Sequence, residues 1–406
     1  MKILFLAPRL PWPMDTGGKI RTANILRQIA KRAEIHLLCF SFSPEEEQLA
    51  QTLEKQENIQ ITLVPGETFN TVDKAINILF NSIPYSIVKY HTSEMSETIR
   101  TTLKLGQFNA VHVDHLHMAS YHSAFKTHPC VLDEHNVESQ IMERCAQVEE
   151  NFLKKKLFAL QAERMKTFES RMIKKFTACL AVSDDDVKIL KRWAGEKTLV
   201  HLIPNGFDGN YFNPTASSAT NVLEKEGPIL LFTGSMDWLP NEDAVVYFAR
   251  EIFPKILEKI PGTKFYIVGK DPSPRVKQLT QNQPNIIVTG RVEDVRPFVA
   301  QSDVFVVPLR IGGGTRLKIL EAMAMGKAVV STSLGAEGIE ATHGRDLVIA
   351  DQPTSFAQEV LNLIPDPQRR EIMGKAARAT ACQKYEWGIV GEKLGNIYNQ
   401  IVGKKS

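Results

Sequence analysis

Short apolar runs rich in β-branched residues alternate with longer segments of helical period along most of the chain. This alternation constrains the fold more than any other feature, because strands joined through helices pair in parallel and build doubly wound α/β sheets. One such series covers residues 2–204, and a second begins at residue 229 after the polar, small-residue stretch 215–221. The sequence therefore predicts an α/β chain of two Rossmann-like domains joined by a linker.

The domain boundaries follow from the same pattern. We expect an N-terminal domain over 1–213, a C-terminal domain over 222–385 and a final helix over 386–406. That helix carries an apolar stripe that must dock on another part of the chain. One long charged helix is expected over 137–175. Because open parallel sheets bind ligands at the carboxyl ends of their strands, a substrate cleft between the two domains is expected.

Charge and composition exclude several classes of protein. Lys and Arg number 49 against 46 Asp and Glu, a net charge of +3, so a nucleic-acid partner is not expected. No apolar stretch approaches the ~18 residues of a membrane span, and the apolar run before Pro8 is shorter than a signal peptide needs. We expect a cytoplasmic protein. The lysines of the 137–175 helix are either a solvated surface or a contact with the anionic cytoplasmic face of a membrane.

The segment 308–326 is the sharpest motif in the chain. Three glycines (312–314) follow a predicted strand, and a helix is expected to open near Thr315. Glycines let a phosphate approach the backbone, and a helix N-terminus attracts anions. Arg316 and Lys318 add positive charge where cations are otherwise disfavoured, which favours a bound diphosphate over a plain glycine loop with a solvated basic turn. Glu321 is expected either to accept ribose hydroxyls or to pair with Lys318.

Two further clusters follow strands of the first domain. Gly17 and Gly18 follow the first strand without the GxGxxG spacing of a dinucleotide site, so NAD is not expected. Asp114 and His115 end a strand near residue 114. Strand alternation predicts that Asp114 and His115 point to opposite faces, which argues against a metal site and favours a substrate contact by one of them.

Several motifs together resemble those of the GT-B retaining glycosyltransferases of family 4, and the resemblance covers nearly the whole chain in order. They are the glycine pair at 17–18, IPNGFD at 203–208, FTGS at 232–235, IVG at 267–269, TGRV at 289–292 and TRLKILEAMAMGKAVVST at 315–332. FTGSMDWLPNEDAV together with GGGTR looks like the branch linked to bacterial exopolysaccharide assembly.

The resemblance implies a role for each matching position. Arg316 and Lys318 would hold the donor diphosphate and act in catalysis, and Glu321 would bind the ribose. Either Asp114 or His115 would be the catalytic contact of the first domain. The remaining donor-binding positions would be Gly17, Gly18, Gly290, Arg291, Val292, Gly312, Gly313, Gly314 and Thr315. Acceptor or sugar contacts are expected from Arg21, His135, Asp237 and Asn241.

The chain departs from the family pattern at the donor site. Gly313 stands where many members carry a glutamate, and Ser235 and Asn241 stand where many carry an arginine and a lysine. Fewer cations would then contact the phosphates, so Arg316 and Lys318 would contribute a larger share of the diphosphate binding.

The resemblance implies a retaining, metal-independent transfer of a hexosyl unit from a nucleotide-diphosphate sugar to a saccharide or lipid-linked acceptor. It also implies that the final helix returns to the first domain. The alternatives are a nucleotide-sugar epimerase or hydrolase on the same fold and a non-catalytic nucleotide-binding protein. The sequence does not identify the sugar, the base or the acceptor.

Overall fold

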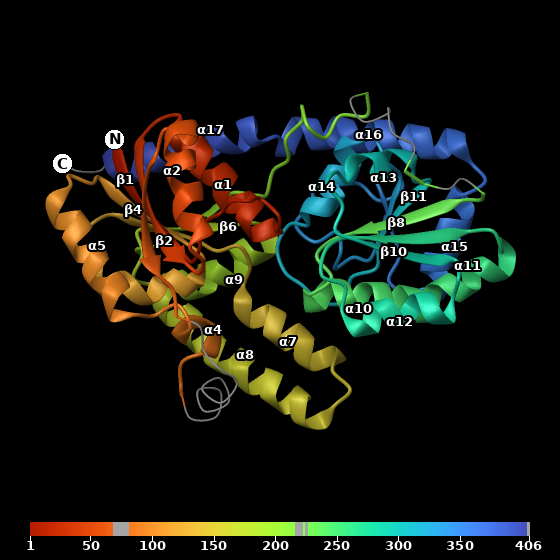
Figure 1. Ribbon diagram of the computed structural model, residues 1–406, viewed down its shortest axis with the longest axis horizontal. Helices are drawn as coiled ribbons and strands as arrows, with labels where there is room; N and C mark the ends of the chain where they lie inside the picture. The colour runs from red at the N-terminus through yellow and green to blue at the C-terminus, as the bar shows by residue number, and fades with distance from the viewer. Residues whose placement is uncertain (68–80, 216–221, 224–225, 404–406) are drawn as a thin grey trace. The chain divides into compact units, whose positions relative to one another are not determined.

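The computed structural model describes residues 1–67, 81–215, 222–223 and 226–403 (Figure 1). The predicted linker consists of Asn213, Pro214 and the stretch 215–221, of which residues 216–221 lie outside the described residues. Contacts divide the chain into two compact units, unit 1 with Met1–Pro204 and Val390–Ser406, and unit 2 with Asn205–Ile389. The sequence placed the corresponding boundaries near residues 213 and 385.

Unit 1 is built on a seven-stranded sheet of order β3-β2-β1-β4-β5-β6-β7, and every recorded pair of neighbours is parallel. The central strands are buried on both faces, which explains why they are continuous apolar runs rather than alternating ones. The strands are β1 Lys2–Ala7, β2 Glu34–Ser41, β3 Gln60–Pro65, β4 Ala110–Asp114, β5 Cys130–Asp133, β6 Ala178–Ala181 and β7 Leu199–Leu202.

Three helices of unit 1, α5, α8 and α9, begin at a side chain that caps the helix. In α5, Thr92 accepts a hydrogen bond from the Met95 N–H, and Met95, Ile99 and Leu103 form the buried stripe at helical spacing. The helices are α1 Gly17–Ala30, α2 Glu45–Glu57, α4 Tyr85–Val88, α5 Ser93–Leu105, η1 Leu116–Tyr121, α6 His122–Phe125, α7 Glu138–Val148, α8 Phe152–Ile173 and α9 Asp184–Ala194.

Unit 2 repeats this design with a parallel six-stranded sheet of order β10-β9-β8-β11-β12-β13. Its strands are β8 Ile229–Thr233, β9 Lys264–Val268, β10 Ile286–Gly290, β11 Val304–Val307, β12 Val329–Ser331 and β13 Val348–Ile349. Its helices are α10 Leu239–Tyr247, η2 Phe248–Ile252, α11 Phe253–Lys259, α12 Pro274–Asn282, α13 Arg296–Gln301, α14 Leu317–Ala324, α15 Pro353–Leu363 and α16 Pro367–Tyr385.

The single helix predicted over 137–175 is wrong, because the chain forms two helices, α7 and α8, there. Glu149 leaves the helical conformation with a ψ of 125°. The Asn151 side chain then accepts hydrogen bonds from the backbone N–H groups of Leu153 and Lys154 and starts α8. The chain therefore leaves the helix at Glu149, and the Asn151 cap begins a second one.

The last helix, α17 Trp387–Gly403, belongs to unit 1 from Val390 onward. In Figure 1 it lies, in blue, beside the red α1, and Arg32 just after α1 donates a hydrogen bond to the Gly391 carbonyl. Its apolar stripe is buried, and the Tyr398 hydroxyl lies 2.6 Å from Nδ1 of His112 on β4. The predicted return of this helix to the first domain is confirmed.

Candidate functional site

The glycine loop before α14 is shaped around Arg316. Arg316 is extended and is the N-cap residue, so α14 begins at Leu317 rather than near Thr315. The Arg316 guanidinium donates to the Gly314 carbonyl at 2.9 Å and lies 3.7 Å from the Glu337 carboxylate. Gly312 has a φ of 140°, and an added Cβ there would lie 2.8 Å from Nη2 of Arg316. A side chain at this position would therefore displace the guanidinium.

Lys318 is a desolvated cation held by a neutral side chain. Its Nζ donates to Oδ1 of Asn241 at 2.8 Å and lies 3.8 Å from the centre of the Phe232 ring. Burial lowers the pKa of Lys318 well below its usual value, the charge of Arg316 lowers it further, and Glu321 acts in the opposite direction. Among the described residues no carboxylate forms an ion pair with this ammonium group. An anion would remove this electrostatic penalty.

The neighbouring positions complete a polar edge of unit 2. Gly234 follows β8, and an added Cβ there would lie 2.8 Å from Nζ of Lys318. Asn241 also donates to the Ser235 carbonyl, and the Ser235 hydroxyl donates to Asp237. Asn241 therefore binds the lysine of α14, and the Ser235 carbonyl fixes the Asn241 amide.

Glu321 and the residues after β10 are the other predicted donor contacts. Burial raises the pKa of Glu321 to about 7, and Lys318 partly opposes that rise. Gly290 ends β10 with a φ of 71°, followed by the exposed Arg291 and the half-buried Val292. Since β8, β10 and β11 are strands of one parallel sheet, their carboxyl ends lie at one edge.

Asn205 is a site residue that the motif analysis did not single out. It is buried, and its side-chain amide donates to the Thr315 carbonyl at 2.8 Å, at the glycine loop. Its position inside the IPNGFD motif was the signal that could have identified it.

In unit 1 the structure brings the predicted histidines and aspartate together beside the glycine pair. Nε2 of His135 lies 2.9 Å from Oδ1 of Asp114, and the Thr22 hydroxyl donates to the other carboxylate oxygen. An added Cβ at Gly18 would lie 3.5 Å from Nε2 of His115. Burial raises the pKa of Asp114 to about 6, while His115 acts to lower it.

The strand-alternation prediction is wrong for His115. Its φ of 67° and ψ of 144° lie in a region that side-chain-bearing residues rarely adopt. This turn brings its ring to the same side as Asp114, with its centroid 3.5 Å from that of His135. Such a strained residue is retained where the surrounding structure fixes it, commonly at functional sites.

Arg21 is not placed for substrate contact. Its side chain is buried, with two hydrogen bonds to the Asp133 carboxylate at 2.6 and 3.2 Å and one to the Pro204 carbonyl. The structure makes it a support beneath the histidine cluster rather than a residue that faces solvent.

Two groups of side chains in the described part of unit 1 have ligand atoms close enough to hold a metal ion. They are Asp114 with His115 and His135, and His112 with Asp114 and Asp133. Arg21 already neutralises Asp133, and Asp114 is engaged by Thr22 and His135. The same contacts satisfy these carboxylates without an ion.

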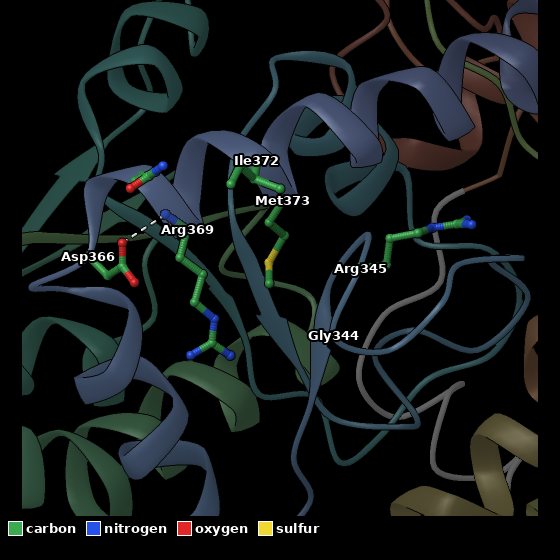
Figure 2. Close-up of a pocket in the computed structure, with 7 residues that line it drawn as sticks. Gly344, Arg345, Asp366, Arg369, Ile372 and Met373 are labelled. Atoms are coloured by element: carbon green, nitrogen blue, oxygen red, sulfur yellow. Dashed lines mark hydrogen bonds between the residues drawn. The ribbon is translucent and has the colours of Figure 1, made fainter.

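A hollow of about 470 Å³ lies elsewhere on unit 2, between the start of α16 and the loop before β13. Figure 2 shows Ile372 and Met373 on α16, with Gly344 and Arg345 on the loop. None of the predicted site residues lines it. It is therefore separate from the candidate site.

In the part of the chain that the structure describes, no helix combines the length and the apolar composition that crossing a membrane requires.

Comparison with known proteins finds a family match within unit 2 and partial matches to two curated relatives. Residues 227–366, all within unit 2, match the model of the family "Glycosyl transferases group 1". A protein of the cps region of Klebsiella pneumoniae is 29% identical over 33% of this chain and 36% of its own length. A GDP-mannose-dependent monoacylated alpha-(1-6)-phosphatidylinositol monomannoside mannosyltransferase of Corynebacterium glutamicum is 27% identical over 49% of this chain and 56% of its own length. The chain thus spans about a third of the first relative's length and little more than half of the second's.

Solved structures match over nearly the whole chain. A sucrose-phosphate synthase from Thermosynechococcus elongatus has a TM-score of 0.76 at 16% identity, covering 99% of this chain and 100% of that one. The Anabaena protein HepE, solved with UDP and glucose, has a TM-score of 0.69 at 16% identity, covering 98% and 99%. The expected GT-B fold, with its two Rossmann-like units, is confirmed.

Proposed function

We propose that this protein is a glycosyltransferase that moves a hexosyl unit from a nucleotide-diphosphate sugar to a hydroxyl of a saccharide or lipid-linked acceptor. The observation that carries the proposal is the half-buried ammonium of Lys318, which donates to the neutral Asn241 close to Arg316 at the start of α14. Two cations at a helix N-terminus without a bonded carboxylate on Lys318 favour a diphosphate ligand. The family match of unit 2 and the nucleotide-bound structures of HepE support this reading.

The chemistry follows from where charge develops. The bond between the anomeric carbon and the phosphate oxygen breaks, and negative charge grows on the departing diphosphate. Arg316, Lys318 and the N–H groups at the start of α14 would stabilise that charge, so the reaction would not require a metal. The acceptor oxygen forms the new bond with retention of configuration, and its proton passes to the leaving phosphate oxygen.

Each remaining residue has a role in this proposal. Glu321 would accept the ribose hydroxyls, the backbone at 290–292 would contact the base, and the glycine loop 312–314 with Thr315 would contact the donor sugar. In unit 1, Gly17 and Gly18 would approach the donor, and Gly18 lies beside His115, whose ring would contact the transferred sugar or the acceptor. Asp114 and His135 would fix the orientation of that ring.

The decisive experiment is calorimetric titration of UDP and GDP into a Lys318→Met variant. Charged hydrogen bonds are worth about 1.5 to 3 kcal/mol, so we expect affinity to fall at least roughly 10-fold, because methionine keeps the length but not the charge. Lys277→Met, an exposed lysine on α12, is the matched control. Equal affinities in the two variants would contradict the site.

Assays of donor turnover on the unaltered protein distinguish the alternative functions. Consumption of the donor without a saccharide would indicate an epimerase or a hydrolase, and binding without any turnover would indicate a non-catalytic protein. For the transferase we expect turnover that persists in EDTA and a product with the anomeric configuration of the donor. Loss of turnover in EDTA with recovery on Mg²⁺ would contradict the metal-independent mechanism.

We also propose that the protein works on the cytoplasmic face of a membrane in bacterial polysaccharide or glycoconjugate synthesis. The support is the start of α8, where Phe152 and Leu153 are 66% and 75% exposed beside Lys154, Lys155 and Lys156. Apolar side chains next to cations are typical of surfaces that contact anionic lipid. Association with the exopolysaccharide branch rests on the motif resemblance alone.

A further inference from the structure

A second cationic cluster lies in unit 1, on segments that none of the roles above uses. Arg9 follows β1, Lys89 follows α4, and both approach the ring of Tyr90. The Arg9 guanidinium donates to the Tyr90 hydroxyl at 2.9 Å, and the Lys89 ammonium lies 5.3 Å from the Tyr90 ring centre. Two positive side chains from distant parts of the sequence are thus gathered on one aromatic ring.

His117 connects this cluster to the candidate site. Its ring lies 5.5 Å from the Tyr90 ring and 5.6 Å from the His115 ring, centre to centre. Nδ1 of His117 is buried and has no hydrogen-bond partner among the described residues. The cluster therefore carries a polar atom that has no hydrogen-bond partner among the described residues.

Arg9 is exposed and Lys89 is half-buried, and Glu46 lies near this cluster, where it accepts a hydrogen bond from the Phe42 N–H. Neither Arg9 nor Lys89 forms an ion pair with a carboxylate within the described ranges of the chain. The exposed Glu67 acts electrostatically on Tyr121, whose hydroxyl donates to the Tyr90 carbonyl. Arg9 instead packs over the Phe42 ring at 5.4 Å, which holds the guanidinium in place without neutralising it.

We propose that Arg9, Lys89 and His117 form a subsite for an anionic group, a carboxylate or a phosphate, carried by the acceptor. This inference rests on the proposed transferase function, because it assigns the ligand to the acceptor. The subsite belongs to unit 1, whereas the proposed diphosphate site belongs to unit 2. A guanidinium and an ammonium that are fixed by aromatic rings would bind an anion with charge-assisted hydrogen bonds, and the His117 ring would supply one more polar contact.

The experiment compares charged and neutral ligands on the full chain, with UDP present at saturation to fill the diphosphate site. Ligand-observed NMR titrations use methyl glucuronoside against methyl glucoside, and glycerol 3-phosphate against glycerol. We expect the unaltered protein to bind at least one of the two anions more tightly than its neutral counterpart. The glucuronoside arm reports an acidic saccharide, and the phosphate arm reports a phosphate-linked acceptor.

Variants then test the residues. Arg9→Gln and Lys89→Gln should each weaken binding of that anion roughly 10-fold or more, since each removes one charged hydrogen bond. Arg9→Lys should retain most of the binding, and Lys126→Gln, an exposed lysine after α6, should not change it. Equal binding of charged and neutral ligands, or anion binding that is unchanged in both glutamine variants, would overturn the proposal.

Failure of the proposed anion subsite can be distinguished from failure of the proposed diphosphate site. UDP affinity should stay unchanged in Arg9→Gln and Lys89→Gln, because the nucleotide is assigned to unit 2. If the unaltered protein binds no nucleoside diphosphate, the proposed function fails while the anion titrations, repeated without UDP, still test this subsite. Reduced UDP affinity in both variants would instead mean that these cations bind the donor, and it would overturn the assignment to the acceptor.

Discussion

At the scale of single residues, the buried carboxyl groups of unit 1 are as unusual as the cations of unit 2. Glu169 is fully buried and accepts hydrogen bonds from the Glu138 N–H, the Ser139 N–H and the Ser139 hydroxyl at the start of α7. Burial raises the pKa of Glu169 to about 8, against the lowering effect of Ser139. Glu134 beside it has two buried oxygens without a hydrogen-bond partner among the described residues, and burial raises its pKa well above the usual value.

These carboxyl groups predict that stability falls as pH rises. Below about pH 4.5 both the folded and the unfolded chain hold the proton of Glu169, and between about 4.5 and 8 only the folded chain holds it. The free energy of unfolding should therefore fall by up to about 1.4 kcal/mol per pH unit for each such group, and level off above pH 8. Asp133, Glu138, Asp186 and Cys179 are titratable groups around this pair.

The measurement is denaturant unfolding from pH 5 to pH 8 of the unaltered protein, Glu169→Gln and Glu163→Gln. The slope with pH should decrease in Glu169→Gln, and it should not change in Glu163→Gln, an exposed glutamate on the same helix. A slope that is identical in all three proteins would show that Glu169 titrates at an ordinary pKa.

The sequence predicted residue identities better than residue contacts. Arg316 and Lys318 were predicted from the conflict between their charge and the helix N-terminus. The partner of Lys318 was not predicted, because Asn241 lies 77 residues away and only the folded sheet brings them together. His115 was assigned to the wrong face because strand alternation holds only within the strand, and its φ of 67° takes it out of that conformation.

At the scale of elements, strands and their order were predicted from apolar runs, whereas the division of one helical segment was missed. Helical period continues across residues 149–151, so periodicity alone does not mark the break between α7 and α8. The signal was Asn151, an N-cap residue inside the segment. The break matters for function because it places Phe152 and Leu153 at the exposed start of α8.

The start of α8 predicts binding to anionic vesicles. Burying an exposed Phe or Leu side chain in lipid stabilises binding by about 1.5 to 3 kcal/mol. Each lysine near an anionic surface adds about 1 kcal/mol of attraction, whereas the negative charges of Glu149 and Glu150 weaken that attraction. Co-sedimentation with phosphatidylglycerol vesicles at low salt should decrease at least roughly 10-fold in a Phe152→Ser, Leu153→Ser double variant. Ile372→Ser, which removes a 62% exposed side chain from unit 2, should bind as the unaltered protein does. Absence of any vesicle binding by the unaltered protein would contradict this role for α8.

At the scale of the whole molecule, unit 1 is assembled from two separate parts of the chain. The main chain leaves unit 1 after Pro204 and returns at Val390. The segments that follow Pro204 and precede Val390 are hydrogen-bonded to each other inside unit 2. The Phe207 N–H donates to the Tyr385 carbonyl, and the Trp387 N–H donates to the Phe207 carbonyl. The apolar stripe of the final helix predicted that it packs on another part of the chain, and the resemblance to GT-B glycosyltransferases predicted that this part is the first domain.

This connectivity predicts that removing residues 390–406 damages unit 1 rather than unit 2, to which these residues are adjacent in sequence. The deletion removes the buried side chains of Val390, Leu394, Ile397, Tyr398 and Ile401. Each large apolar side chain is worth about 1.5 to 3 kcal/mol when buried, so their sum is comparable with the ~5 to 15 kcal/mol of net stability typical of a folded protein. Hydrogen exchange should therefore become fast in β1, β4 and α1, while the strands of unit 2 stay protected.

A milder variant keeps this prediction testable if the truncated chain does not accumulate. Tyr398→Phe leaves the packing of α17 in place and removes only the hydroxyl that lies 2.6 Å from Nδ1 of His112. Nε2 of His112 already lacks a partner within the described residues, so the variant leaves the whole imidazole without side-chain hydrogen bonds in a buried position. An unsatisfied buried polar group costs about 1 to 3 kcal/mol, which should lower the protection of β4 first, whereas Asn396→Ala on the exposed face of α17 should have no effect. If unit 2 lost protection together with unit 1 in the truncated chain, or if β4 in Tyr398→Phe exchanged as slowly as in the unaltered protein, the last helix would not be an integral part of the first unit.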